Sequence, residues 1–149
     1  MSSKLTCFVL SAALLALSFP AQAQQPLKVP RIAFLSAVSP SSISPRTEAF
    51  RQGLRELGYV EGKSIVIEYR WAEGKFDRLP DLAAELVRLK VDVILSGGPT
   101  ATRPAKEATV TIPIVMAFDD DPVGSGFVAS LARPGGNITG LSTLAPEIN

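Results

Sequence analysis

The chain has 149 residues, of which 46% are hydrophobic and 19% are charged, and this balance indicates a globular protein of about one domain. Its 15 basic and 14 acidic residues leave a net charge of +1, which argues against nucleic acid or a membrane surface as a partner. The chain has no histidine and a single cysteine, Cys7, which excludes a Ser-His-Asp triad, a histidine-ligated metal and an internal disulfide.

The first 23 residues have the pattern of a secretory signal peptide. Lys4 supplies the basic start, residues 5–19 form an uncharged apolar run, and Ala21-Gln22-Ala23 matches a small-residue cleavage signal. The apolar run is short for a transmembrane anchor. We therefore expect cleavage between Ala23 and Gln24 and export to the periplasm or out of the cell.

Beyond this segment, residues 24–30 read as a tether, and strand and helix patterns then alternate to the end of the chain. Short apolar runs indicate strands, and apolar residues at helical spacing indicate helices. In chain order we expect a strand at 31–36, a helix at 45–57, a strand at 64–69, a helix at 76–89, a strand at 91–95, a helix at 102–109, a strand at 112–118, a helix at 123–132 and a strand at 138–141.

This alternation predicts an α/β fold, a three-layer sandwich with a parallel sheet and helices on both of its faces. The first, third and fourth strands are the most apolar, which places them centrally and gives the strand order 2-1-3-4-5. Ligands of open α/β sheets bind beyond the carboxyl ends of the strands, at the switch point. The loops 36–45 and 96–100 should face each other there, with the loop after the fourth strand beside them.

Several long strings resemble one family, the ABC transporter substrate-binding proteins often described as tryptophan/tyrosine-type. They occur at residues 50–63 (FRQGLRELGYVEGK), 67–74 (IEYRWAEG), 82–87 (LAAELV), 121–124 (DPVG) and 131–140 (LARPGGNITG). The resemblance implies a periplasmic binding protein with a type I-like fold, which closes two lobes around a small solute. It further implies that residues 31–149 are the N-terminal lobe, with the second lobe absent from this chain.

Carried over by position, the resemblance places the ligand face on three loops. Thr100 and nearby N–H groups would bind a carboxylate, Asp119 or Asp120 an ammonium group, and Phe118 would form an apolar wall. The expected ligand-binding residues are Ser36, Ala37, Gly98, Pro99, Thr100, Phe118 and Asp119. The family implies a small-molecule solute, an amino acid among the candidates, and an ABC permease of the inner membrane as partner, with no catalytic residue, metal or cofactor.

Two other functions remain open. The chain could be an exported single-domain ligand sensor, or a magnesium-dependent hydrolase that uses the acidic run Asp119-Asp120-Asp121. The hydrolase is the weaker alternative, because the first strand ends in Ser36 and supplies no further carboxylate. Neither a G-x-G-x-x-G nor a G-x-x-x-x-G-K-[ST] motif is present, so the sequence gives no fingerprint for a nucleotide.

Overall fold

The computed structural model describes residues 28–143 of the chain. The expected signal peptide, its cleavage point at Ala23 and Gln24, and most of the expected tether lie outside these residues. The elements are β1 (Arg31–Ser36), η2 (Pro40–Ile43), α2 (Ser44–Glu56), β2 (Val66–Trp71), η3 (Phe76–Arg78), α3 (Leu79–Arg88), β3 (Val93–Ser96), α4 (Pro99–Ala108), β4 (Ile114–Asp119) and β5 (Ile138–Ser142).

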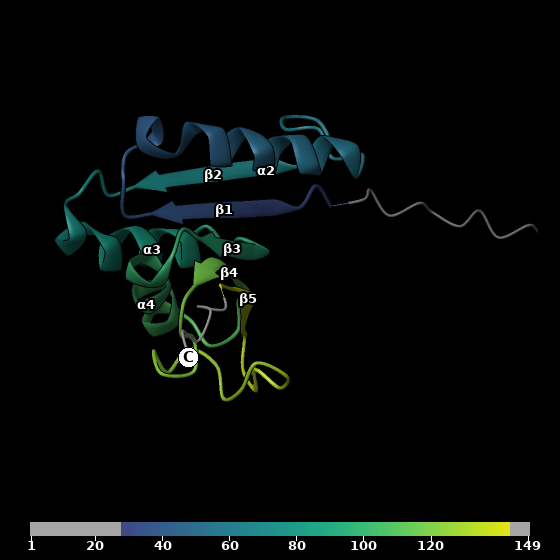
Figure 1. Ribbon diagram of the computed structural model, residues 1–149. Helices are drawn as coiled ribbons and strands as arrows, with labels where there is room; N and C mark the ends of the chain where they lie inside the picture. Colours follow the sequence, from purple (N-terminus) through teal and green to yellow (C-terminus); the bar gives the residue numbers. More distant parts are fainter. Residues whose placement is uncertain (1–27, 144–149) are drawn as a thin grey trace, which may run out of the picture.

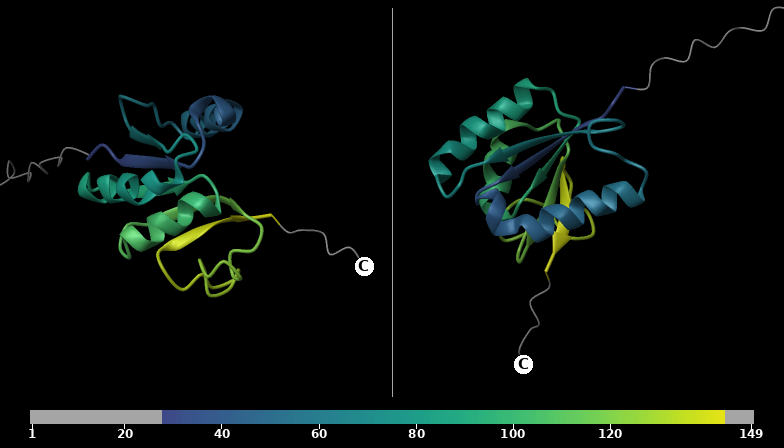
Figure 2. Two further views of the ribbon diagram at one scale, coloured as in Figure 1. Left: turned by 90° about the vertical axis from the view of Figure 1, so that its left-hand side faces the viewer. Right: turned by 90° about the horizontal axis from the view of Figure 1, so that it is seen from above.

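The five strands form one parallel sheet in the order β2-β1-β3-β4-β5, which confirms the predicted fold class and strand order. Figure 1 shows the strands side by side from β2 to β5. Helix α2 lies on one face of the sheet, and α3 and α4 lie on the other (Figure 2). All carboxyl ends therefore meet at one edge of the sheet.

The larger core lies between the sheet and helices α3 and α4. Leu35 of β1, Ile94 of β3 and Ile114 of β4 are fully buried, as are Leu86 of α3 and Ala101 of α4. These are apolar positions of buried strands and of amphipathic helices, the pattern from which the sequence predicted the elements. This core fixes the positions at which β1, β3 and β4 end.

The opposite face carries an aromatic cluster beneath α2. The ring centroid of Phe34 lies 6.1 Å from that of Phe50, 6.0 Å from Tyr69 and 5.2 Å from Trp71. Arg51 Nε donates a hydrogen bond of 2.9 Å to the Tyr69 hydroxyl, and burial raises the pKa of this tyrosine. These contacts hold α2 over β1 and β2.

The helix predicted at residues 123–132 is wrong. Residues 122–127 form a series of turns, because Pro122 and two glycines interrupt the helical pattern. Asp121 Oδ1 accepts the Gly124 N–H at 2.7 Å, and Gly126 has a φ of +71°. Phe127 is nevertheless buried. The spacing of apolar residues in this stretch therefore indicated which residues are buried, and it did not indicate a helix.

Other elements differ from their predicted bounds. The helix expected at 76–89 divides into η3 and α3, and the loop expected at 36–45 contains η2. Strand β2 ends at Trp71, two residues beyond the strand expected at 64–69. Helix α4 begins at Pro99, three residues earlier than its predicted core, and contains Pro104. Since proline has no N–H, the carbonyl of Thr100 loses its helical donor.

Candidate ligand-binding site

The loops that follow β1, β3 and β4 meet at the carboxyl edge of the sheet. The Gly97 N–H donates to the Leu35 carbonyl oxygen at 2.9 Å, and a methyl group built on Gly97 would lie 3.4 Å from Ser36 Oγ. A methyl group on Gly98 would lie 2.8 Å from Phe118 Cζ. The expected convergence of these three loops is therefore present.

The turn between β3 and α4 is fixed by two buried hydroxyl groups. Ser96 Oγ lies 2.7 Å from Thr102 Oγ1, and Thr102 Oγ1 donates to the Gly98 carbonyl oxygen at 2.9 Å. Gly98 has a φ of +97°, a conformation that favours glycine. This turn sets the distance between Gly98 and the ring of Phe118.

A trough of about 690 Å³ opens beside these loops, on the α2 face of the sheet. We call it the α2 trough. Its floor and walls are almost entirely apolar, and its volume falls within the range of small-molecule pockets. It is lined by Phe34, Ser36, Val38, Ile43, Arg46, Ala49, Phe50, Leu95, Gly97, Val115, Met116, Ala117, Phe118, Leu141 and Thr143.

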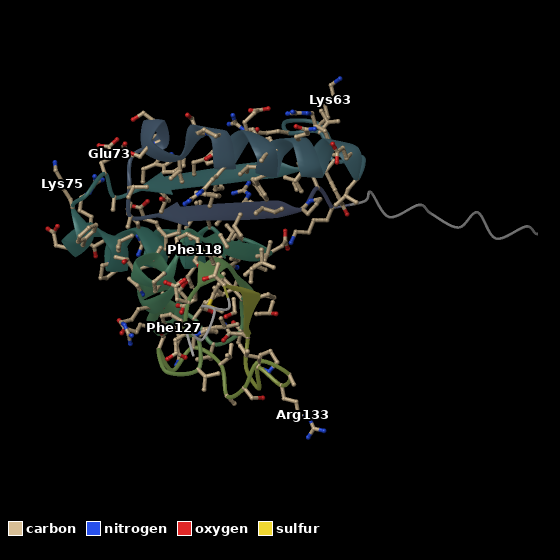
Figure 3. All side chains as sticks on the ribbon, in the orientation of Figure 1. Lys63, Glu73, Lys75, Phe118, Phe127 and Arg133 are labelled. Carbon is tan, nitrogen blue, oxygen red and sulfur yellow. The ribbon has the colours of Figure 1, made fainter. Side chains whose placement is uncertain are left out.

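Two of the predicted residues, Ser36 and Phe118, line the α2 trough. Ser36 is almost fully buried, and its Oγ accepts the Val38 N–H at 3.3 Å. The pairing of β4 with β5 shifts register between Met116 and Asp119, and Phe118 is 37% exposed at this irregular end (Figure 3). Ala37, in contrast, belongs to the core, and its carbonyl oxygen already accepts the Gly74 N–H.

Pro99 and Thr100 do not line the trough. They lie in a shallower hollow between η3, α3 and α4, beside Phe76 and Pro80. The start of α4 also has few free donors. Pro99 has no N–H, and the N–H groups of Ala101 and Thr102 both donate to the Gly98 carbonyl oxygen, at 3.1 and 3.0 Å.

The three consecutive aspartates turn toward different partners. Asp119 is 2% exposed, its Oδ1 accepts the Asp121 N–H at 2.7 Å, and its Oδ2 has no hydrogen-bond partner among the described residues. Asp120 instead bonds the Thr143 hydroxyl. Within residues 28–143 no group of three or more His, Cys, Asp or Glu side chains could hold a metal ion. An unpartnered buried carboxylate oxygen is an acceptor suited to an ammonium group.

Sequence reasoning missed Arg46. Its guanidinium carbon lies 5.5 Å from the centroid of the Phe118 ring, and the side chain lines the α2 trough. The apolar stripe of α2 runs through Phe50 and Leu54, and one turn earlier the same stripe reaches position 46. A cation at the end of an apolar stripe was the available signal.

Comparison with known proteins identifies the chain's relatives. Residues 31–147 match the sequence profile of a family described as ABC transporter substrate binding protein. A tyrosine-binding protein of Clostridioides difficile (strain R20291) is 32% identical over 115 residues, which are 77% of this chain and 33% of that protein.

Solved structures show the same fold. A conserved domain protein from Vibrio cholerae matches with a TM-score of 0.75 and 33% identity, over 80% of this chain and 40% of that one. An ABC domain from Streptococcus pneumonia, solved in complex with L-Trp, matches with a TM-score of 0.71 and 30% identity, over 76% of this chain and 38% of that one. The chain thus spans well under half the length of these relatives.

Proposed function

Because this chain belongs to the ABC transporter substrate-binding protein family, we propose that it is a lobe that captures an aromatic amino acid or a related small solute for an ABC permease. The relatives are binding proteins and not enzymes, which supports a non-catalytic role at family level. The observation that carries the proposal is the α2 trough, an apolar cavity that opens where the loops after β1, β3 and β4 converge.

The proposal gives each of the expected ligand-binding residues its own role. Phe118 offers an aromatic wall to the solute in the α2 trough. Asp119 does not line the trough, and the proposal assigns its buried, unpartnered Oδ2 to an ammonium group at the end of β4. Ser36 and Gly98 shape the entrance, while Ala37 contributes backbone only. Pro99 and Thr100 line the separate hollow beside Phe76, and they keep a place in the proposal only as the residues that start α4 after Gly98.

The wider setting of the protein is part of the same proposal. Residues 1–23 would direct export and place the protein in the periplasm, where it would deliver its solute to the permease of the inner membrane. In the part of the chain that the structure describes, no helix has the length and apolarity needed to cross a bilayer. The solute would be enclosed when a second lobe closes over this one by a hinge motion.

Titration calorimetry with L-tyrosine and L-tryptophan tests the proposed function on the full chain. The Asp119→Asn variant keeps the side-chain oxygen that accepts the Asp121 N–H but removes the charge. We expect the unchanged chain to bind one of the two amino acids and Asp119→Asn to bind it about 10-fold more weakly.

The matched control is Asp81→Asn, which alters an exposed aspartate of α3, a helix on the other face of the sheet. It should change the affinity less than about 3-fold, since a screened surface charge contributes little. Absence of binding to both amino acids by the unchanged chain would contradict the proposal, and magnesium-dependent hydrolysis would favour an enzyme instead.

A further inference from the structure

We propose that Arg46 is the carboxylate anchor of this site, so that the preferred solute is an organic acid whose apolar body occupies the α2 trough. This inference rests on the proposed function and deepens it, because it assigns the anion-binding role to a residue outside the predicted loops. The juxtaposition that supports it is a single cation at the edge of an otherwise apolar cavity.

Arg46 differs from the paired arginines of the described chain. Arg31, Arg51, Arg55 and Arg70 each have a carboxylate oxygen within 4 Å. Within residues 28–143 no carboxylate approaches Arg46 in this way. Glu48, two residues further along α2, pairs with Arg51 and Arg55 instead. The charge of Arg46 is therefore available to a ligand.

The contact with Phe118 positions the guanidinium group of Arg46 and leaves its N–H groups free to donate hydrogen bonds. The guanidinium carbon of Arg46 lies 5.5 Å from the ring centroid, a cation–π arrangement that uses the face of the ring. The guanidinium N–H groups have no hydrogen-bond acceptor among the described side chains. A planar fork of free N–H groups matches the two oxygens of a carboxylate.

The apolar lining of the α2 trough favours an apolar body for the part of the solute beyond its carboxylate. Phe34, Phe50, Leu95, Val115 and Leu141 present carbon surface to the cavity. A second charge placed among them would lose its hydration without a partner, whereas an aromatic or branched body would gain from burial. The solute class that fits both features is an acid with an apolar side chain.

The alternative anion site, at the start of α4, has few free hydrogen-bond donors. Only the Thr100 N–H remains free there among positions 99–102, since Pro99 has none and two N–H groups bond the Gly98 carbonyl oxygen. Thr100 and Pro99 also line the other hollow, away from the trough. Arg46 is the cationic side chain that lines the trough itself.

The test compares L-tyrosine with tyramine, which has the same ring and ammonium group but no carboxylate. Calorimetry on the full chain should show L-tyrosine binding about 10- to 100-fold more tightly than tyramine. In Arg46→Gln this preference should fall to about 3-fold or less, through weaker binding of L-tyrosine and little change for tyramine. Arg46→Lys should recover part of the preference, because it restores the charge without the fork.

Arg133→Gln is the control, since Arg133 is an exposed arginine far from Phe118 (Figure 3). It should leave both affinities unchanged. If the unchanged chain binds L-tyrosine and Arg46→Gln binds it equally well, the role of Arg46 is overturned while the proposed function stands. If the unchanged chain binds neither L-tyrosine nor L-tryptophan, the proposed function fails and this inference fails with it.

Discussion

At the scale of single residues, Gly98 determines how closely the loop after β3 approaches β4. Any residue with a side chain would be strained at the Gly98 φ of +97°. A methyl group at this position would also lie 2.8 Å from the Phe118 ring. Gly62 has a similar φ of +80°, but a methyl group on it would have nothing within 4 Å. Gly98 also has a ψ of 175°, a combination that only glycine adopts readily, so it carries both backbone strain and a steric contact.

We expect Gly62→Ala to lower the free energy of unfolding by about 1 kcal/mol, from backbone strain alone. Gly98→Ala should lower it by about 2–3 kcal/mol, because its backbone conformation is more strained for alanine and the added methyl group must also displace Phe118. Denaturant unfolding of both variants measures the difference. Equal losses would contradict this account, because neither the backbone conformation of Gly98 nor the contact with Phe118 would then add to the cost.

Asp92 is a second residue with a definite role, at the end of the sheet opposite the site. It accepts hydrogen bonds from Lys28 Nζ and from the Arg31 N–H, and these bonds lower the pKa of its carboxyl group from the ordinary 3.8. A carboxyl group whose pKa is lowered in the folded state stabilises the fold at every pH above its unfolded-state pKa. That stabilisation is lost as the pH falls through the folded-state pKa.

Asp92→Asn should therefore unfold at a lower denaturant concentration than the unchanged chain at pH 7. The gap should narrow as the pH falls from 3.8 through the lowered folded-state pKa, because Asp92 is protonated first in the unfolded state and only then in the folded state. Denaturant titrations between pH 7 and pH 2.5 measure the gap. Asp77→Asn, an exposed aspartate on η3, is the control, and a gap of constant size across this range would contradict the assignment.

At the scale of elements, the buried contact between Ser96 and Thr102 joins β3 to α4. Both side chains are fully buried, so removing either hydroxyl takes one hydrogen bond from the other. Thr102 would keep its bond to the Gly98 carbonyl oxygen, and Ser96 would keep the Val115 carbonyl oxygen at 3.5 Å. The loss of one such bond costs about 1 kcal/mol, and removing both groups costs less than the sum. The two residues therefore form an energetically coupled pair.

We expect Thr102→Val and Ser96→Ala each to destabilise the protein by about 1–2 kcal/mol. The double variant should be more stable than the sum of the two losses predicts, by about 1 kcal/mol. A double-mutant cycle in denaturant gives this coupling energy directly. Strictly additive losses would mean that the hydroxyl contact does not hold α4 in place.

The elements also show what the sequence could predict. Parallel order and strand positions follow from apolar runs, so each end of β1, β3 and β4 lies within two residues of its predicted position. The helix predicted at 123–132 failed because apolar spacing records burial, and turns bury Phe127 and Val128 equally well. Turn chemistry at Pro122, Gly124 and Gly126 decided the local structure.

At the scale of the whole molecule, the sheet is covered unequally. Helices α3 and α4 close one face, whereas α2 lies over β1 and β2 and leaves the α2 trough open above β3, β4 and β5. The match to relatives covers 33–40% of their length, so the proposed lobe would meet further structure in a complete binding protein. The open trough is where we place the solute.

The position of the site could be predicted from topology, but its composition could not. The order of the strands places Ser36, Gly98 and Phe118 at one edge. The sequence does not reveal that α4 starts at Pro99 and directs Thr100 into another hollow, nor that Arg46 reaches Phe118 from α2. The first fact depends on the turn that Ser96 and Thr102 fix between β3 and α4, and the second depends on the packing of α2.

The most direct test of the account is amide chemical-shift mapping by NMR, with the isotope-labelled full chain titrated with L-tyrosine and L-tryptophan. The account predicts that shifts concentrate at Val38, Gly97, Gly98 and Phe118, around the mouth of the α2 trough, and leave Lys63 unchanged. Shifts centred on the hollow beside Phe76, or no shift at millimolar amino acid, would contradict it.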